Sequence, residues 1–359
     1  MKKIDLEILQ NGIKDYIDEN ELKVKEGGKY FSNVEYYGRM RLLNFFQKNG
    51  FLKKSNEKYS IDEIKQKINL AEKYNNLFEV FLVILKKEGF VDIKDGFLIT
   101  SSKIDSDDLK KDFLNIEKFK EDLIKKFPDM VCHFNLLDIC ISNYNFILSG
   151  EKSADSVMFP VYSTHLVEGI FRGNLLADYF NILMAKTTSE YVKNIRKCDD
   201  ERVIKIVEIG AGTGGTSLFV MDALKEERNV EFYFTDISKV FVRGNEKKYK
   251  EKYSFSIFKK LNVEESLPEQ GFGLEEFDIV IATNVVHATK NINNTLKSAI
   301  SLLNNDGILL LNEVTKVQDF TTLTFGLLGG WWHYEDLDKR LPNSPLLTIK
   351  AWESILKES

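Results

Sequence analysis

The chain has 359 residues, of which 43% are hydrophobic and 26 are phenylalanine, so it can form two domains with a substantial core. Its net charge of −5 argues against a general nucleic-acid binder, because recognition of phosphates needs a basic surplus. The sequence contains neither an apolar run of the roughly 20 residues that a membrane span needs nor a secretory signal, so we expect a cytoplasmic protein.

The first hundred residues are predicted to be mainly helical and to end in a hairpin. Apolar residues recur at helical spacing over Tyr36–Phe51, Ile61–Ile68 and Leu70–Lys87. Alternating residues then flank Asp95-Gly96, a pair typical of a two-residue hairpin turn. This order outlines a winged helix. Because the chain is acidic, a packing or dimerisation module fits the outline better than a DNA-binding one.

Two more helical stretches follow. Residues 101–128 are rich in charge but carry apolar residues at helical spacing, which predicts a solvated connecting helix after a loop at 101–108. Residues 129–200 mix aromatic and polar residues, a composition that fits a lid over a ligand or an ordinary packing layer. His133 and His165 lie in this region without an evident catalytic partner.

The chain is organised around the sequence VIKIVEIGAGTGGT at 203–216. An apolar strand, Val203–Ile209, passes through glycines into a helix, Thr216–Leu224, and such a turn exposes backbone N–H groups to a ligand. The glycine spacing fits a dinucleotide as well as S-adenosylmethionine. Glu208 favours S-adenosylmethionine, because a buried carboxylate gains a partner in a cationic ligand and would repel a pyrophosphate.

After this turn, strands alternate with helices, which predicts a parallel sheet covered on both faces. The second strand, Val230–Ser238, carries Asp236, which is placed to bind both ribose hydroxyls or to start the next helix. The basic stretch Lys247–Lys260 is interpreted as a solvated helix face followed by a buried strand; a surface for nucleic acid or for an acidic carrier protein is a weaker alternative. It leads to Asn262-Val263, where an adenine amino group would sit.

The last two predicted strands end in polar residues. The strand Asp278–Thr283 runs into a loop with Asn284 and His287. Another strand, Ile308–Asn312, follows a predicted tight turn at Asp306-Gly307 and ends in Glu313. Because ligands bind at the carboxyl ends of strands in open parallel sheets, we expect His287 and Glu313 to face the same cleft as the glycine turn.

Several stretches combine into a more specific pattern than the glycines alone: FPVYSTHLVEGIFRGNLLADYFN (159–181), EIGAGTGGT (208–216), FTDIS (234–238), FDIVIATNVVHAT (277–289), LLLNEVT (309–315) and FGLLGGWW (325–332). Together they resemble the C-methyltransferase domains of polyketide synthases over residues 145–356, and in outline before that. The resemblance implies a class I methyltransferase fold: a Rossmann-like α/β architecture with a doubly wound, mainly parallel sheet and a mostly α-helical N-terminal lid domain. The expected domains are 1–190, with the winged-helix-like outline at 30–100, and 191–359, the core that binds S-adenosylmethionine.

The resemblance also implies a reaction, in which a methyl group passes from S-adenosylmethionine to the α-carbon of a β-ketoacyl chain on acyl carrier protein, leaving S-adenosyl-L-homocysteine. The catalytic His and Glu of the family map onto His287 and Glu313. An imidazole can remove an acidic α-proton near neutral pH, and a carboxylate can orient it. We add Asn284 as a third catalytic candidate and expect no metal. The expected cofactor-binding residues are Glu208, Gly210, Ala211, Gly212, Gly214, Asp236, Ile237, Asn262, Val263 and Asn284.

Two features depart from the family. Asn262 stands where an acid is usual, although an amide oxygen can still accept from the adenine amino group. The chain also stops at Ser359, before the antiparallel hairpin that usually completes this sheet, so it is either a piece of a larger synthase or has a truncated sheet. Acyl carrier protein and other synthase domains are the expected partners. Three irregularly spaced cysteines, Cys132, Cys140 and Cys198, indicate reduced thiols and no disulfide framework.

Other functions stay open. An O-methyltransferase acting on a hydroxyl of a polyketide or related small molecule would use the same cofactor site, and many such enzymes carry a winged-helix module. A non-catalytic methyltransferase-like domain of a synthase would keep the fold, but the glycine turn and His287 are intact. A dehydrogenase using NAD would leave Glu208 without a role. Trp331, Trp332 and His333 are interpreted either as a wall of the acyl channel or as core residues.

Overall fold

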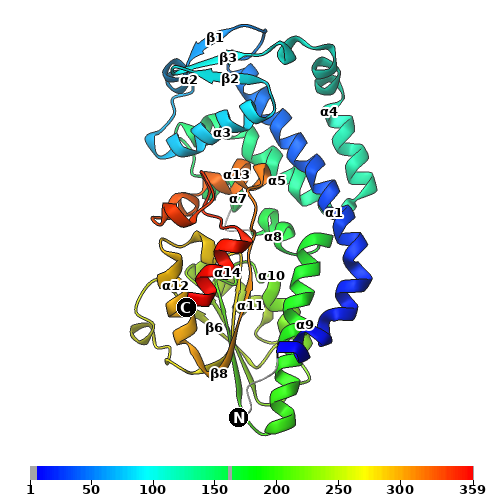
Figure 1. The fold of residues 1–359 in the computed structure, drawn as a ribbon, viewed down its shortest axis with the longest axis vertical. Helices are drawn as coiled ribbons and strands as arrows, with labels where there is room; N and C mark the ends of the chain where they lie inside the picture. Colours follow the sequence, from blue (N-terminus) through cyan, green and yellow to red (C-terminus); the bar gives the residue numbers. More distant parts are fainter. Residues whose placement is uncertain (1–5, 161–163, 359) are drawn as a thin grey trace.

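The computed structural model describes residues 6–160 and 164–358, so residues 161–163 of the expected lid lie outside the described part. The molecule is elongated, with a mostly helical unit at one end and an α/β unit at the other (Figure 1). Helix α1 (Leu6–Lys48) runs along one side of both units. Within the described ranges, no helix is long and apolar enough to cross a membrane.

The α/β unit is built on a five-stranded parallel sheet. Its strands are β4 (Ile204–Ile209), β5 (Val230–Asp236), β6 (Ser256–Lys260), β7 (Phe277–Thr283) and β8 (Leu303–Asn312), in the order β6-β5-β4-β7-β8. The chain moves outward from β4 through β5 to β6 and then crosses to β7. The carboxyl ends of β4 and β7 therefore flank the point where the strand order reverses, which is where open sheets bind ligands.

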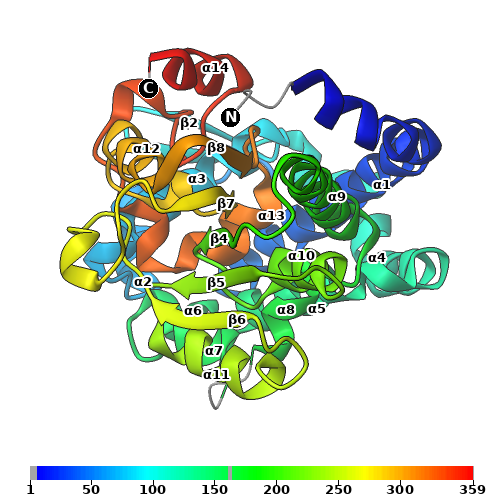
Figure 2. The same ribbon diagram turned by 90° about the horizontal axis from the view of Figure 1, so that it is seen from below.

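Helices cover both faces of this sheet, as the sequence predicted (Figure 2). On one face, apolar residues of the strands pack with α9 (Leu175–Cys198) and α10 (Gly215–Leu224). On the other face they pack with α12 (Ile292–Ser301) and α14 (Ile349–Glu358). Helix α11 (Lys239–Tyr249) precedes β6, as interpreted from the basic stretch, but β6 is an edge strand in which only Ser256 is buried, so the expected buried strand is wrong. The expected domain boundary at residue 190 falls inside α9.

The predicted tight turn at Asp306-Gly307 is wrong. These residues lie inside β8, where the pairing with β7 shifts from Leu303 opposite Phe277 to Ile308 opposite Ile279. A Cβ at Gly307 would lie 3.0 Å from the carbonyl oxygen of Phe277, so the irregular stretch is pressed against the neighbouring strand. A local glycine signal does not distinguish such a bulge from a turn.

The predicted order of helices followed by a hairpin is present in the helical unit. Helices α2 (Ile61–Lys67) and α3 (Asn75–Lys87) are followed by the hairpin strands β2 (Val91–Lys94) and β3 (Phe97–Thr100). Asp95 and Gly96 both have positive φ, as the hairpin turn requires. A short strand that the sequence pattern does not indicate, β1 (Lys58–Ser60), pairs with β3 at the edge of this small sheet.

Helix α1 begins thirty residues before the predicted start at Tyr36. Its first half is polar and contacts α9 along a narrow line, where Tyr16 stacks on Tyr179 with 5.6 Å between ring centroids. A Cβ at Gly12 would collide with the Glu190 side chain, so the two helices lie very close there. A line this narrow leaves little hydrophobic periodicity in the sequence, which explains why the pattern was missed.

The remaining elements of the helical unit are α4 (Asp107–Lys126), α5 (Val131–Ser142), α6 (Tyr144–Leu148), α7 (Ala154–Met158) and α8 (His165–Phe171). Helix α4 matches the predicted charged connecting helix. Helix α13 (Asp319–Thr324) follows β8 in the chain but inserts Phe320 and Leu323 into the helical core. The segment directly after the last strand therefore ties the two units together.

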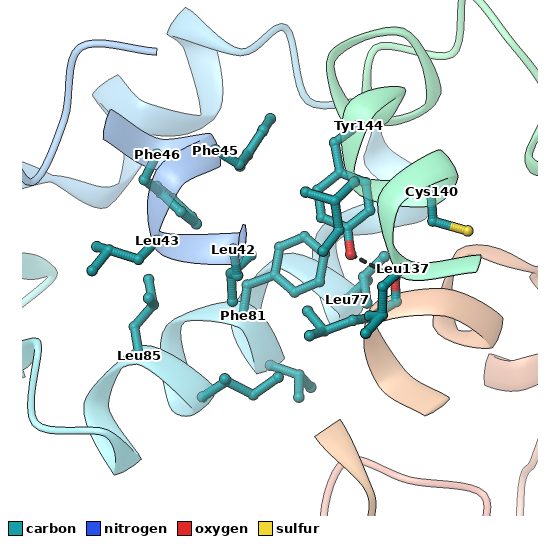
Figure 3. Close-up of a cluster of buried hydrophobic side chains, with 14 of the residues drawn as sticks. Leu42, Leu43, Phe45, Phe46, Leu77, Phe81, Leu85, Leu137, Cys140 and Tyr144 are labelled. Carbon is teal, nitrogen blue, oxygen red and sulfur yellow. Dashed lines mark hydrogen bonds between the residues drawn. The ribbon is translucent and has the colours of Figure 1, made fainter. Parts of the chain in front are cut away.

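Tyr144 shows how this core holds α13 (Figure 3). Its fully buried ring stacks on Phe81 with 5.1 Å between centroids, and its hydroxyl donates to the carbonyl oxygen of Leu323 at 2.5 Å.

We expect Tyr144→Phe to lower the free energy of unfolding by about 1–3 kcal/mol, because a buried hydrogen bond to α13 is lost. Tyr59→Phe is the matched control: its hydroxyl donates to Glu57 near the surface, where a change of about 0.5 kcal/mol or less is expected. Urea unfolding measures both. Equal effects of the two substitutions would contradict a specific role of the Tyr144 hydroxyl.

Candidate active site

A histidine–glutamate pair lies at the carboxyl ends of β7 and β8. His287 sits in a short 3-10 turn (Val286–Ala288) after β7, and Glu313 directly follows β8. The imidazole Nδ1 lies 2.5 Å from Glu313 Oε2, and both side chains are less than a tenth exposed. The other carboxylate oxygen of Glu313 accepts the backbone N–H groups of Val285 and Val286, at 3.0 and 2.8 Å.

These contacts define the donor and acceptor roles in the pair. One oxygen of the Glu313 carboxylate accepts two backbone N–H groups, and the second oxygen faces the imidazole as an acceptor as well. Nδ1 of His287 must then carry the proton, which leaves the lone pair on Nε2. Among the described residues, the ring makes no second hydrogen bond. The pair is therefore arranged as a base with a fixed tautomer.

Asn284 locks the two strand ends together. It has the left-handed backbone conformation (φ 50°), which turns the chain sharply after β7, and its side-chain oxygen accepts the backbone N–H of Val314 at 3.0 Å. Glu313 bonds in the opposite direction, to the turn after β7. Each loop thus donates backbone N–H groups to a side chain of the other, and Asn284, expected as a catalytic and cofactor residue, has a structural partner here.

The glycine turn connects directly to this loop. Gly210 has a φ of 64°, and a Cβ there would lie 2.9 Å from Cβ of Val285, the residue whose N–H binds Glu313. A Cβ at Gly215 would meet the carbonyl oxygen of Phe171 at 2.7 Å. Only Gly212 borders open space, with its nearest neighbour 3.9 Å away. Gly210 and Gly215 therefore allow other segments of the protein to pack against the turn, whereas Gly212 leaves room for a ligand.

We expect Gly210→Ala to destabilise the fold more than Gly212→Ala. Both place alanine at positive φ, which costs roughly 1–2 kcal/mol, but only the first also collides with Val285, which adds about 1–3 kcal/mol. Unfolding in urea measures the difference. The double variant Gly210→Ala/Val285→Ala should recover part of the added cost, because it removes the two methyl groups of Val285 and leaves only the contact with its Cβ. If the two single variants are equally stable, the packing argument fails.

Glu208 is completely buried at the end of β4, and the Ser217 hydroxyl of α10 donates to its carboxylate. Burial raises the pKa of Glu208 to about 7, opposed in part by this hydrogen bond. The sequence predicts a cationic ligand as the partner of Glu208 and does not indicate Ser217. Nothing in the spacing of the two residues indicates the bond, because it depends on how α10 packs against β4.

Asp236 is the last residue of β5, and Asn262 lies just after β6. Asp236 accepts the N–H groups of Gly212 and Ser238, at 2.9 and 2.7 Å, so it holds both the glycine turn and the start of α11; burial raises its pKa. The Asn262 side-chain oxygen accepts the N–H of Glu264. Gln270, which the sequence pattern does not indicate, accepts the backbone N–H of Asn262 and donates to its carbonyl oxygen. Of the other expected cofactor residues, Ala211 and Val263 are buried and Ile237 is exposed.

The other histidine candidates lie apart from this pair. His133 is buried between Phe31 and Phe320, where burial lowers its pKa to about 4, so it is a neutral core residue. His165 lines a cavity of about 810 Å³ between α8 and α10, which neither His287 nor Glu313 lines. Trp331, in contrast, is buried with its ring centroid 6.1 Å from that of His287. In the described part of the chain, no group of three or more His, Cys, Asp or Glu side chains could hold a metal ion.

Comparison with known proteins identifies the family of the chain. A family model described as "Methyltransferase domain" matches residues 207–309. The polyketide synthase PksR of Bacillus subtilis (strain 168) is 39% identical over 298 residues, which is 82% of this chain but 12% of that synthase. The solved structure of the DszA carbon methyltransferase is 34% identical, with a TM-score of 0.86 over 93% of this chain and 85% of that one. That of the CurJ carbon methyltransferase is 26% identical, with a TM-score of 0.85 over 98% and 90%.

The fold and the matching model define an S-adenosylmethionine-dependent methyltransferase. Because the likeness to a solved carbon methyltransferase covers nearly the whole of both chains, the protein belongs to the C-methyltransferase domains of polyketide synthases. The fold class predicted from the sequence is confirmed, including the mostly helical N-terminal region before the sheet.

Proposed function

We propose that this domain methylates the α-carbon of a β-ketoacyl thioester carried by acyl carrier protein, with His287 as the general base and Glu313 as its orienting partner. The observation that carries the proposal is the 2.5 Å contact between the two side chains at the carboxyl ends of β7 and β8. A base with a free Nε2 suits removal of a proton made acidic by two flanking carbonyl groups.

The residues at the glycine turn fit S-adenosylmethionine. The Thr213 hydroxyl is buried and has no hydrogen-bond partner among the described residues, and Gly212 beside it borders open space. Gly210, Ala211, Gly212 and Gly214 would hold the amino-acid part with their backbone, and Glu208 and Asn284 would stand beside it. Asp236 would accept from the ribose hydroxyls, and Ile237, Asn262 and Val263 would surround the adenine. When bound, the cofactor supplies a methyl group activated by a positive sulfur.

The work of the protein's own side chains is proton transfer. His287 takes the α-proton on Nε2, and the negative charge of Glu313 stabilises the imidazolium that forms. Because Glu313 is itself fixed by two backbone N–H groups, the imidazole needs little reorientation during the reaction. The indole ring of Trp331 lies beside the imidazole of His287 and provides an apolar surface there, which favours an acyl chain.

The helical unit does not favour oxygen over carbon as the acceptor. The likeness to the DszA carbon methyltransferase extends over 93% of this chain, so the winged-helix-like region accompanies carbon methylation in that protein. Acyl carrier protein and neighbouring synthase domains remain proposed partners, since this chain spans 12% of the synthase PksR.

The proposal is tested by incubating the domain with S-adenosylmethionine and a β-ketoacyl pantetheine thioester. We expect one added methyl by mass spectrometry, located on the α-carbon by fragmentation. A hydroxyl-bearing polyketide analogue serves as the competing acceptor. Methylation of the hydroxyl alone, or no methylation by protein that still binds S-adenosylhomocysteine, would overturn the proposal.

A further inference from the structure

A buried arginine lies behind the turn that carries His287. The Arg340 side chain is 1% exposed and forms an ion pair with Asp336, whose side chain is 4% exposed, with 2.6 Å between Nε and Oδ1. A buried charge is costly unless its partners are complete, so such a pair is retained only where its hydrogen bonds are well satisfied. Here all three guanidinium nitrogens have partners.

Two of these partners are backbone carbonyl oxygens in residues 287–289, the end of the turn that carries His287. One terminal nitrogen of Arg340 donates to the carbonyl oxygen of His287 at 2.7 Å and to that of Pro345 at 2.6 Å. The other donates to the carbonyl oxygen of Thr289 at 2.8 Å. The planar guanidinium thus spans the end of the turn in a fixed geometry, which the single ammonium of a lysine cannot reproduce.

Asp336 extends the contact to the next helix. Its second carboxylate oxygen accepts the backbone N–H of Ile292, the first residue of α12, at 2.8 Å. The pair therefore holds the catalytic turn at Thr289 and the helix that begins three residues later. Glu313, at the end of β8, fixes the imidazole ring of His287. Arg340, which lies later in the chain, binds the backbone carbonyl oxygen of the same residue.

We propose that Arg340, held by Asp336, is a positioning residue for His287; this rests on the function proposed above. Its guanidinium contacts the backbone of the turn and takes no part in the proton transfer itself. It keeps Nε2 at the place where the α-proton is removed. A displacement of about 1 Å in a catalytic group can cost on the order of 10²-fold in rate.

The test compares Arg340→Met and Arg340→Lys with the unchanged domain. We expect Arg340→Met to lower kcat by about 10²-fold, with KM for the pantetheine thioester and Kd for S-adenosylhomocysteine within about twofold. The kcat of Arg340→Lys should lie between that of Arg340→Met and that of the unchanged domain. In hydrogen–deuterium exchange, amides of residues 285–292 should exchange faster in both variants, while those of residues 206–216 stay unchanged.

The matched control is Arg202→Met. Arg202 also pairs with a buried aspartate, Asp278, but at the opposite end of β7, so its loss should lower stability without changing kcat or exchange at 285–292. The proposal is overturned if Arg340→Met keeps its kcat. It is also overturned if kcat falls together with cofactor binding and exchange protection throughout the domain. If the domain without substitutions fails to methylate the thioester, the proposed function is refuted. The exchange comparison needs no substrate, so it still tests whether Arg340 holds the turn that carries His287.

Discussion

Replacing His287 by glutamine is expected to lower the rate of α-carbon methylation by about 10²- to 10⁴-fold, the usual contribution of a general base. Glutamine has similar reach but cannot accept a proton at neutral pH. Binding of S-adenosylhomocysteine should change little, because the glycine turn follows a different strand, β4, and His287 makes no hydrogen bond to it among the described residues. Quenched turnover followed by mass spectrometry gives the rate, and calorimetry gives the Kd.

Glu313→Gln should cause a comparable loss for a different reason. The amide oxygen can still accept the N–H groups of Val285 and Val286, which turns the amide NH₂ group toward Nδ1 of His287. Nδ1 must then accept, so the proton moves to Nε2 and the base is lost without a change of shape. The corresponding wrong-tautomer effect in the serine-protease triad is about 10⁴-fold in kcat.

His165→Gln is the control for both substitutions. His165 lines the cavity between α8 and α10, apart from Glu313, and its loss should leave the rate within about twofold. Removal of the α-proton can be followed separately, by deuterium uptake into the thioester in D₂O above the uncatalysed background. Methylation by His287→Gln within tenfold of the unchanged domain, with cofactor binding intact, would eliminate this residue as the base.

Glu208→Gln is expected to have opposite effects on folding and on cofactor binding. The pKa of Glu208 is raised from 4.5 to about 7 by burial, so between these values the folded state binds a proton that the unfolded state has lost. Stability therefore falls as pH rises from about 4.5 to about 7. The shift corresponds to about 3 kcal/mol. The uncharged variant avoids this loss and should be more stable than the unchanged domain at pH 8, by up to about that amount.

Cofactor affinity should depend on pH in the reverse direction. A cationic ligand favours the ionised carboxylate, so the affinity of the unchanged domain for S-adenosylmethionine should rise as pH increases through about 7. The glutamine variant should bind more weakly and show no such rise. Thermal unfolding with and without ligand at pH 6 and pH 8 measures both effects. Ser217→Ala is a useful comparison, because it removes the hydroxyl that donates to the carboxylate and should raise the pKa further.

A variant Glu208→Gln that loses stability at pH 8 would show that the carboxylate is satisfied by the protein alone. An unchanged affinity for S-adenosylmethionine would remove Glu208 from the cofactor site. The two outcomes are independent, since the first needs no ligand.

Short-range patterns in the sequence were sufficient for the elements that lead to the site. The run Val203–Ile209 and its glycines predict a strand, a turn and a helix, because glycine is needed where φ is positive. Asp95-Gly96 predicts the hairpin for the same reason. Asn284, His287 and Glu313 were chosen because they follow strands, and parallel strands bring their carboxyl ends to one edge. These inferences depend on a few neighbouring residues and on one rule of topology.

Other features depend on contacts between distant segments. The first thirty residues of α1 have a weak apolar pattern and are helical because α9 supports them. The bulge at Asp306-Gly307 depends on how β8 pairs with β7. The close contact between Gly210 and Val285 cannot be predicted from the residues next to either of them in the chain. In each case the deciding contact lies far away in the chain.

The sequence by itself determined the class of fold and the glycine turn, and it indicated His287 and Glu313 as candidates. The tertiary structure alone decided that Glu313 is fixed by two backbone N–H groups, that Ser217 is the partner of Glu208, and that Arg340 holds the turn of His287. The physical reason is range. Backbone conformation and periodicity are set by neighbours in the chain, whereas hydrogen bonds between loops are set by strand order, register and helix packing, which only the folded molecule brings together.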